Sequence, residues 1–232
     1  MEHAAVIIGA SGGIGHAFAQ ALAEEGAYAR IWRFARSGGG DGVLDLTDEE
    51  SIAAAARLVA SGPPIGLVFV ATGLLHEGDR GPEKTFRAID ADWLARVYAV
   101  NTIGPALIAK HFLPLLPKEE RSTMAFLSAR VGSISDNSIG GWHGYRAAKA
   151  ALNMMVRNFA IELARTHKRA ICVALHPGTV DTELSKPFQG NVVAGRLFSS
   201  DRAAVQLLDV LDGLKPGDSG RLFSWDGEEI AP

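Results

Sequence analysis

The chain has 232 residues with a formal net charge of −3 at pH 7, and hydrophobic residues make up 47% of it. Such a chain can bury the core of one domain and shows no sign of disorder. No basic excess points to nucleic acid or to an anionic membrane, so neither is expected as a partner. No apolar run reaches the ~18 residues of a membrane span, and no secretory signal is recognisable, so a cytoplasmic location is expected.

Short apolar runs alternate with longer helical patterns along the whole chain. Strands are predicted at 4–10, 28–35, 65–73, 122–129, 169–178 and 220–225, and helices at 16–26, 47–62, 90–116, 144–165 and 199–214. This alternation, with nearly continuous apolar strands, predicts an α/β fold. We expect a Rossmann-type doubly wound parallel sheet between two layers of helices, as a single NAD(P)-binding domain over residues 1–232.

Two of the predicted helices carry local signals. Thr47 is expected to be the N-cap of the helix at 47–62, with Glu50 three residues later completing a capping box. The long pattern at 90–116 is expected to bend near Gly104 and Pro105.

The segment GASGGIG, residues 9–15, lies between the first predicted strand and the first helix. Glycines let the backbone approach a pyrophosphate, and the helix N-terminus offers it free N–H groups. The spacing differs from the common G-x-G-x-x-G fingerprint, and a simple tight turn is the alternative interpretation. The position at the first strand-to-helix turn favours dinucleotide binding, with candidate residues Gly9, Ser11, Gly12, Gly13, Ile14 and Gly15.

Tyr145 and Lys149 stand four residues apart in a predicted helix and therefore share one face. A phenol has a pKa near ~10 in water. An adjacent ammonium and a cationic nicotinamide ring favour the phenolate and are expected to lower this pKa toward working pH, so that Tyr145 can exchange a proton with a carbonyl or alcohol oxygen. A packed tyrosine beside a surface lysine is the alternative interpretation of the pair.

Ordered motifs along the chain resemble those of the short-chain dehydrogenase/reductases over nearly its whole length. They are GASGGIG (9–15), LDLTD (44–48), ATG (71–73), VNTIGP (100–105), YRAAK (145–149) and HPGTVDT (176–182). The sequence around YRAAK is similar to the C-factor-like branch, which is related to small carbonyl reductases. The resemblance implies an oxidoreductase that reduces a carbonyl or oxidises an alcohol by hydride transfer. The alternative is a nucleotide-binding signalling or regulatory protein of the same fold with little turnover.

The resemblance also implies roles for individual residues. Tyr145 would be the acid/base, Lys149 would lower its pKa and hold the nicotinamide ribose, and Asn101 would support a water relay. The family holds the substrate oxygen with the second serine of a Ser-Ser pair, which here reads Ser128-Ala129. Ser128 and Ser133 are both candidates for that role, and loss of such a donor can cost ~10²–10³ in rate.

The end of the second predicted strand bears on the choice of cofactor. NAD-preferring members of the family have an acidic residue where this chain has Ala35, and Arg36 follows. The guanidinium fork suits a 2′-phosphate, so NADP(H) is favoured over NAD(H), with Arg33 as the alternative if the register differs. The resemblance implies further cofactor contacts from Asp45, Leu46, Ala71, Thr72, Gly73, Asn101, Tyr145, Lys149, Pro177, Gly178, Val180 and Thr182.

The remaining expectations concern substrate and assembly. The polar, irregular segment near 183–199 corresponds to the family's substrate loop, and Trp142 and His143 could line a pocket for a small carbonyl or alcohol. The histidines lack metal-ligand spacing, so no metal is predicted. The helix at 144–165 is apolar around much of its circumference, which favours a homodimer or homotetramer.

Overall fold

A computed structural model describes residues 2–191 and 195–232, and confirms the predicted doubly wound sheet. Its strand order is β10-β9-β6-β5-β4-β1-β2-β3, and every neighbouring pair is parallel except β9 and β10. The strands are β1 (Ala4–Ile8), β2 (Arg30–Ala35), β3 (Gly42–Val43), β4 (Ile65–Val70), β5 (Ser122–Leu127), β6 (Ala170–His176), β9 (Leu222–Ser224) and β10 (Glu229–Ile230). The antiparallel β10 and the short β3 were not predicted.

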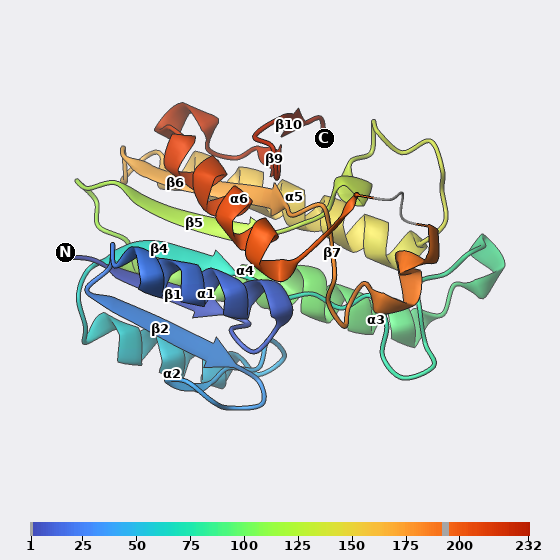
Figure 1. The fold of residues 1–232 in the computed structure, drawn as a ribbon, viewed down its shortest axis with the longest axis horizontal. Helices are drawn as coiled ribbons and strands as arrows, with labels where there is room; N and C mark the ends of the chain where they lie inside the picture. Colours follow the sequence, from blue (N-terminus) through green and yellow to red (C-terminus); the bar gives the residue numbers. More distant parts are fainter. Residues whose placement is uncertain (1, 192–194) are drawn as a thin grey trace.

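Helices cover both faces of the sheet (Figure 1). Helices α1 (Gly13–Glu25) and α6 (Ser200–Gly213) lie on one face, and α2 (Glu49–Ala60), α4 (Gly104–Phe112) and α5 (His143–Leu163) lie on the other. Because successive side chains of a strand point to opposite faces, Val6 and Ile8 join the core under α2, α4 and α5, whereas Ala5 and Ile7 join the core under α1 and α6. No described helix is long and apolar enough to cross a membrane.

The first turn of α2 differs from its prediction. Asp48, not Thr47, is the N-cap, and its side chain accepts a hydrogen bond from the Glu50 N–H. Thr47 instead donates its backbone N–H and its hydroxyl to the carboxylate of Asp45. The predicted cap was wrong because a neighbouring carboxylate takes the threonine hydroxyl.

The long pattern at 90–116 is interrupted as predicted, but by an unexpected element. Helix α3 (Ala91–Tyr98) passes into a π-helical segment at Ala99–Ile103, and α4 follows from Gly104. A π-helical turn widens the helix and recurs at functional sites. Here it carries Asn101, which is completely buried.

The strand order reverses at β1, which has β2 on one side and β4 on the other. In open α/β sheets, ligands bind at the carboxyl ends of the strands where this reversal occurs. The glycine segment at 9–15 follows β1 there, and residues 71–73 follow β4. The fold therefore predicts a ligand-binding site at this edge of the sheet.

Candidate active site

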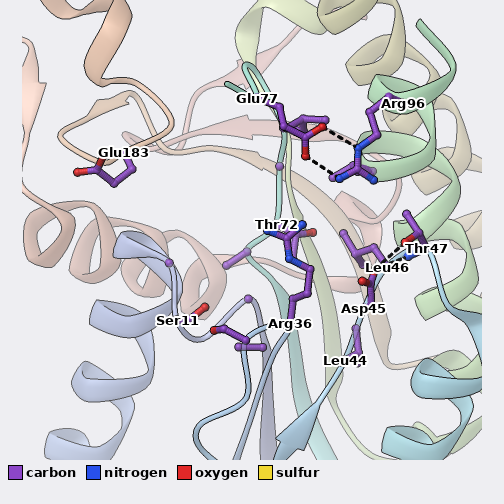
Figure 2. Close-up of a pocket in the computed structure, with 18 of the residues that line it drawn as sticks. Ser11, Arg36, Leu44, Asp45, Leu46, Thr47, Thr72, Glu77, Arg96 and Glu183 are labelled. Atoms are coloured by element: carbon purple, nitrogen blue, oxygen red, sulfur yellow. Dashed lines mark hydrogen bonds and ion pairs between the residues drawn. The ribbon is translucent and has the colours of Figure 1, made fainter. Parts of the chain in front are cut away.

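A cavity of about 490 Å³ lies at the carboxyl ends of β1, β2 and β4 (Figure 2). Many of the residues expected to bind a cofactor line it: Gly9, Ser11, Gly12, Arg36, Asp45, Leu46, Ala71, Thr72 and Gly73. The cavity is thus built from four segments that are distant in sequence and meet at the reversal of the strand order.

The glycine segment folds back tightly on itself. Gly9 has a φ of +89°, and a Cβ on Gly15 would overlap the carbonyl oxygen of Gly9. Only glycine permits this approach, which places Ser11 and Gly12 at the cavity directly before α1, whereas Gly13, Ile14 and Gly15 do not line it. Gly12 is the N-cap of α1 without a side-chain cap, so the free N–H groups of the first turn suit an anion.

Two arginines were considered for a phosphate, and the structure separates them. Arg36 extends from the end of β2 into the cavity, beside Ala35 (Figure 2). Arg33 does not line this cavity, and its guanidinium donates to the Ala19 carbonyl of α1 at 3.4 Å. Of the two candidates, Arg36 is therefore the arginine whose side chain lines the cavity.

Asp45 and Thr72 contribute polar groups to the same wall. Two hydrogen bonds from Thr47 hold the pKa of Asp45 below its ordinary value, so Asp45 is ionised at neutral pH. The hydroxyl oxygen of Thr72 is buried and has no hydrogen-bond partner among the described residues. A buried polar atom of this kind needs a partner. Together with the glycine turn and Arg36, it fits a phosphorylated dinucleotide.

Asn101 joins the π-helical segment to the exit of β4. Its side-chain oxygen accepts from the Leu74 N–H at 2.9 Å, and its nitrogen donates to the Leu74 carbonyl at 2.8 Å. A Cβ on Gly73 would lie 3.5 Å from the Asn101 side-chain oxygen and 3.9 Å from the Lys149 Nζ. Gly73, which lines the cavity, is thus next to the buried amine of Lys149.

Lys149 and Tyr145 lie on one face of α5, as predicted from their spacing. The Lys149 Nζ donates to the Leu127 carbonyl at 2.9 Å and lies 5.8 Å from the centre of the Tyr145 ring. Burial lowers the pKa of Lys149 to about 7. Burial raises the pKa of Tyr145, which is opposite to the expected direction, because the low-dielectric interior penalises the phenolate and the amine is itself only partly charged.

The two candidate serines are both buried and both hydrogen-bonded elsewhere. The Ser128 hydroxyl donates to the Asn153 side-chain oxygen at 2.7 Å, and the Ser133 hydroxyl oxygen accepts from the Asp136 N–H at 3.1 Å. The choice between them for the substrate oxygen stays a prediction.

The segment after β6 reaches the cavity only at its far end, where Glu183 lines it (Figure 2). Pro177 and Gly178 lead into β7 (Thr179–Val180), which pairs with β8 (Leu197–Phe198) and closes the base of the predicted substrate loop. Thr182 lies against the glycine segment, where a Cβ on Gly13 would lie 2.8 Å from its methyl carbon. Of the loop predicted near 183–199, residues 192–194 lie outside the described residues.

Residues next to the start of α5 hold an unusual backbone. Trp142 has a φ of 51° and is the only non-glycine residue with positive φ among the described residues. Such a conformation costs roughly 1–3 kcal/mol and persists only where the surroundings hold it. The Trp142 N–H donates to the Glu83 carbonyl, and the Gly144 N–H donates to the Glu83 carboxylate at 3.0 Å.

Other cavity residues were not found from the sequence: Ser37, Leu44, Thr47, Leu74, His76, Glu77, Arg96, Val100 and Glu183. Arg96 of α3 forms a two-pronged ion pair with Glu77, at 2.8 and 3.2 Å (Figure 2). Leu44, Thr47 and Val100 lie within motifs quoted above but were not assigned a role in the site, whereas no motif identifies Glu77 in the loop after β4 or Arg96 on α3. No group of metal-ligating side chains is found among the described residues.

Comparison with known proteins accounts for this arrangement. The family model described as enoyl-(acyl carrier protein) reductase matches residues 9–205. The 1-hydroxy-2-glutathionyl-2-methyl-3-butene dehydrogenase of Rhodococcus sp. (strain AD45) is 35% identical over 185 residues, which is 79% of this chain and 76% of that protein. The chain belongs to the short-chain dehydrogenase/reductase family, and is an oxidoreductase of that family.

Solved structures agree over the whole chain. The NADPH-bound carbonyl reductase from chicken fatty liver has a TM-score of 0.83 at 27% identity, covering 99% of this chain and 94% of that one. A short-chain dehydrogenase/reductase from Burkholderia multivorans with bound NADP has a TM-score of 0.83 at 26% identity, covering all of both chains.

Burial of Lys149 predicts a pH-dependent stability. The lysine has a pKa of about 7 when folded and 10.5 as the ordinary value, so between these pH values the unfolded chain binds more protons and stability rises with pH. Relative to Lys149→Met, the wild type should gain on the order of 3 kcal/mol in free energy of unfolding between pH 7 and pH 9.5. Urea denaturation of both proteins across this range measures the difference, and parallel pH profiles would contradict it.

Proposed function

We propose that the chain is an NADP(H)-dependent reductase of small carbonyl compounds that can also run in reverse as an alcohol dehydrogenase. The observation that carries the proposal is the placement of Tyr145 and Lys149 on one face of α5, with the Lys149 amine next to the cavity wall at Gly73. The NADPH-bound carbonyl reductase from chicken fatty liver and the NADP-bound Burkholderia multivorans structure support the choice of reaction and cofactor.

We assign the residues that would hold the cofactor from the cavity and from the segments next to it. The glycine turn and the N-terminus of α1 would bind the pyrophosphate, and Arg36 would bind a 2′-phosphate. Asp45 and Leu46, which line the cavity, would contact the adenine end, while Pro177, Gly178, Val180 and Thr182 would contact the nicotinamide end. When bound, NADPH supplies a hydride to the carbonyl carbon.

The protein supplies the proton. Because burial raises the pKa of Tyr145, its hydroxyl is protonated at neutral pH and is ready to donate to the carbonyl oxygen as negative charge develops there. Lys149, with a pKa of about 7, can carry positive charge beside the phenol during that transfer and bind the ribose hydroxyls. Asn101 fixes the backbone of Leu74 and so the distance between cavity and amine. Ser128 or Ser133 would hold the substrate oxygen.

A second candidate function is a nucleotide-binding signalling or regulatory protein with little turnover. It is favoured by a likeness to the C-signal protein of Myxococcus xanthus, which is 34% identical over 143 residues, 61% of this chain and 81% of that protein. The replacement of the family's second serine by Ala129 also supports it. Turnover with purified protein distinguishes the two.

Removal of the Tyr145 hydroxyl tests the mechanism. Tyr145→Phe should abolish the oxidation of NADPH in the presence of reactive aldehydes or diketones, a loss of at least ~10²-fold, because it removes the proton donor. The affinity for NADPH should be unchanged. Loss of absorbance at 340 nm measures the rate, and fluorescence titration measures binding.

The matched control is Tyr28→Phe. Tyr28 lies beside a different cavity with Arg121 and Asp212, so its variant should keep full activity. Equal activity in the Tyr145 variant and the wild type would reject the mechanism, and an inactive wild type that binds NADPH would favour the signalling function.

Arg36 should determine the preference between the two nicotinamide cofactors. Arg36→Ala removes a charge-assisted contact to the 2′-phosphate and should raise the KM for NADPH by about 10–100-fold, with little change for NADH. Arg33→Ala is the control, because Arg33 bonds to α1 and should leave the ratio unchanged. A larger effect at Arg33 than at Arg36 would show that the register assigned to β2 is wrong.

Helix α5 is the proposed interface of a homodimer or homotetramer. Met154 and Ile161 of α5 are exposed, and Met154 lines an apolar cavity of about 450 Å³ with Ile134 and Ile230. Burying such a surface in a second copy would remove it from water.

Light scattering at micromolar concentration should therefore give at least twice the subunit mass of 24.6 kDa. Met154→Asp should shift the mass toward one subunit, because it places a charge in the apolar contact. Val205→Asp, at an exposed position of α6, should not. A wild-type mass of one subunit would contradict the assembly.

A further inference from the structure

The start of α5 combines a strained residue with a buried carboxylate. Trp142 adopts the left-handed conformation described above, directly before the helix that carries Tyr145. The N-cap of α5 provides no side-chain hydrogen bond, and Glu83 takes this role from a loop 61 residues before Gly144. Glu83 is 5% exposed, and its second carboxylate oxygen has no hydrogen-bond partner among the described residues.

Stability alone does not explain this combination. A glycine would adopt the backbone of position 142 without strain, as the neighbouring Gly140 and Gly141 do at φ values of 69° and 66°. A serine or aspartate at the N-cap would satisfy the first turn of the helix without burying a half-paired carboxylate. What the arrangement does achieve is a fixed position for the indole ring.

The indole ring lies between the phenol and the substrate loop. Its centre is 6.2 Å from that of Tyr145 and 5.2 Å from that of Phe188, with steep interplanar angles in both pairs. Phe188 belongs to the segment Lys186–Asn191, which lies beside the start of α5 in Figure 1. His76 contacts the other side of Phe188 at 6.0 Å and meets the Glu183 carbonyl at 3.0 Å. Trp142, Phe188 and His76 together form what is here called the aromatic wall.

We infer that Trp142, held by Glu83, is the specificity-determining residue of the site and favours carbonyl compounds that carry a flat aromatic or conjugated group. This rests on the proposed function, which places the carbonyl oxygen at the Tyr145 hydroxyl. A substituent on the carbonyl then lies against the aromatic wall, where ring edges and faces complement another ring. A polyol or charged substituent would lose its hydration there for few polar partners. Glu83 is a positioning residue that acts through Trp142.

The test compares two diketones of similar reactivity, 1-phenyl-1,2-propanedione and 2,3-hexanedione, with NADPH. The wild type should show a kcat/KM about tenfold higher for the phenyl compound, mostly through KM. Trp142→Gly should bring the ratio of the two kcat/KM values to about one, and it should fold because glycine suits this backbone. Trp142→Phe should retain most of the preference.

Variants of Glu83 test whether this residue positions Trp142 or only fills space beside it. Glu83→Gln keeps an oxygen that accepts the Gly144 N–H, so it should retain the preference, whereas Glu83→Ala should lose it as Trp142→Gly does. Phe86→Ala, at a side chain that is 69% exposed, is the control and should change nothing. An unaltered preference in Trp142→Gly, or no preference in the wild type, overturns the inference while leaving carbonyl reduction intact.

If the wild type turns over neither diketone, the proposed function fails instead. Saturation-transfer NMR with the NADPH-bound protein then decides the inference separately. Preferential binding of the phenyl compound that Trp142→Gly abolishes would support the aromatic wall, and equal binding of both compounds would overturn it.

Discussion

The close approach of the β4 exit to helix α5 is the constraint on which the rest of the site depends. Asn101 bonds both backbone groups of Leu74, and residue 73 has no side chain, so that a Cβ added there would lie 3.9 Å from the Lys149 amine. The π-helical turn at Ala99–Ile103 makes this possible because it carries a buried side-chain amide into the sheet edge. In the function proposed above, the cavity and the buried pair of titratable groups act as one site.

The pKa shifts of Lys149 and Tyr145 have opposite signs, yet each shift favours the neutral form of its group. Burial disfavours the ammonium of Lys149 and the phenolate of Tyr145 alike, so both groups tend toward their neutral forms. Sequence spacing correctly identified the two side chains as neighbours. The lowering expected for the pKa of the phenol depended on the ammonium and a cationic nicotinamide ring together, whereas burial raises this pKa, and burial is not encoded in a five-residue motif. Strongly shifted groups beside a cavity are characteristic of functional sites. A ligand that brings positive charge to this pocket would lower the pKa of Tyr145, which is the direction that the motif suggested.

Hydrophobic alternation was sufficient for the sheet, because strands covered on both faces are continuously apolar and the helices between them are amphipathic. It was also sufficient for Gly9 and Arg36, which follow directly after β1 and β2 and can be placed once those strands are known. The hydrophobic pattern does not identify Glu77 and Glu83, which come from the loop after β4. It also does not identify Arg96, which comes from a face of α3. It also failed for Thr47, whose hydroxyl is captured by Asp45 rather than by the first turn of α2. Local competition for a hydrogen bond decides such cases.

The departures from regular structure are concentrated around the proposed reaction centre. The π-helical turn, the left-handed Trp142, the unpaired Thr72 hydroxyl and the half-paired Glu83 carboxylate surround the start of α5 and the cavity. The central strands β1, β4, β5 and β6 are nearly completely buried instead, and the pairing of β5 with β4 and β6 keeps one register throughout. Strain and unsatisfied polar groups persist only where the surrounding structure holds them, and a regular core of this kind can hold them. The cost of each irregularity is therefore best understood together with the group it positions: Asn101 holds the backbone of Leu74, and Glu83 holds the backbone on either side of the start of α5.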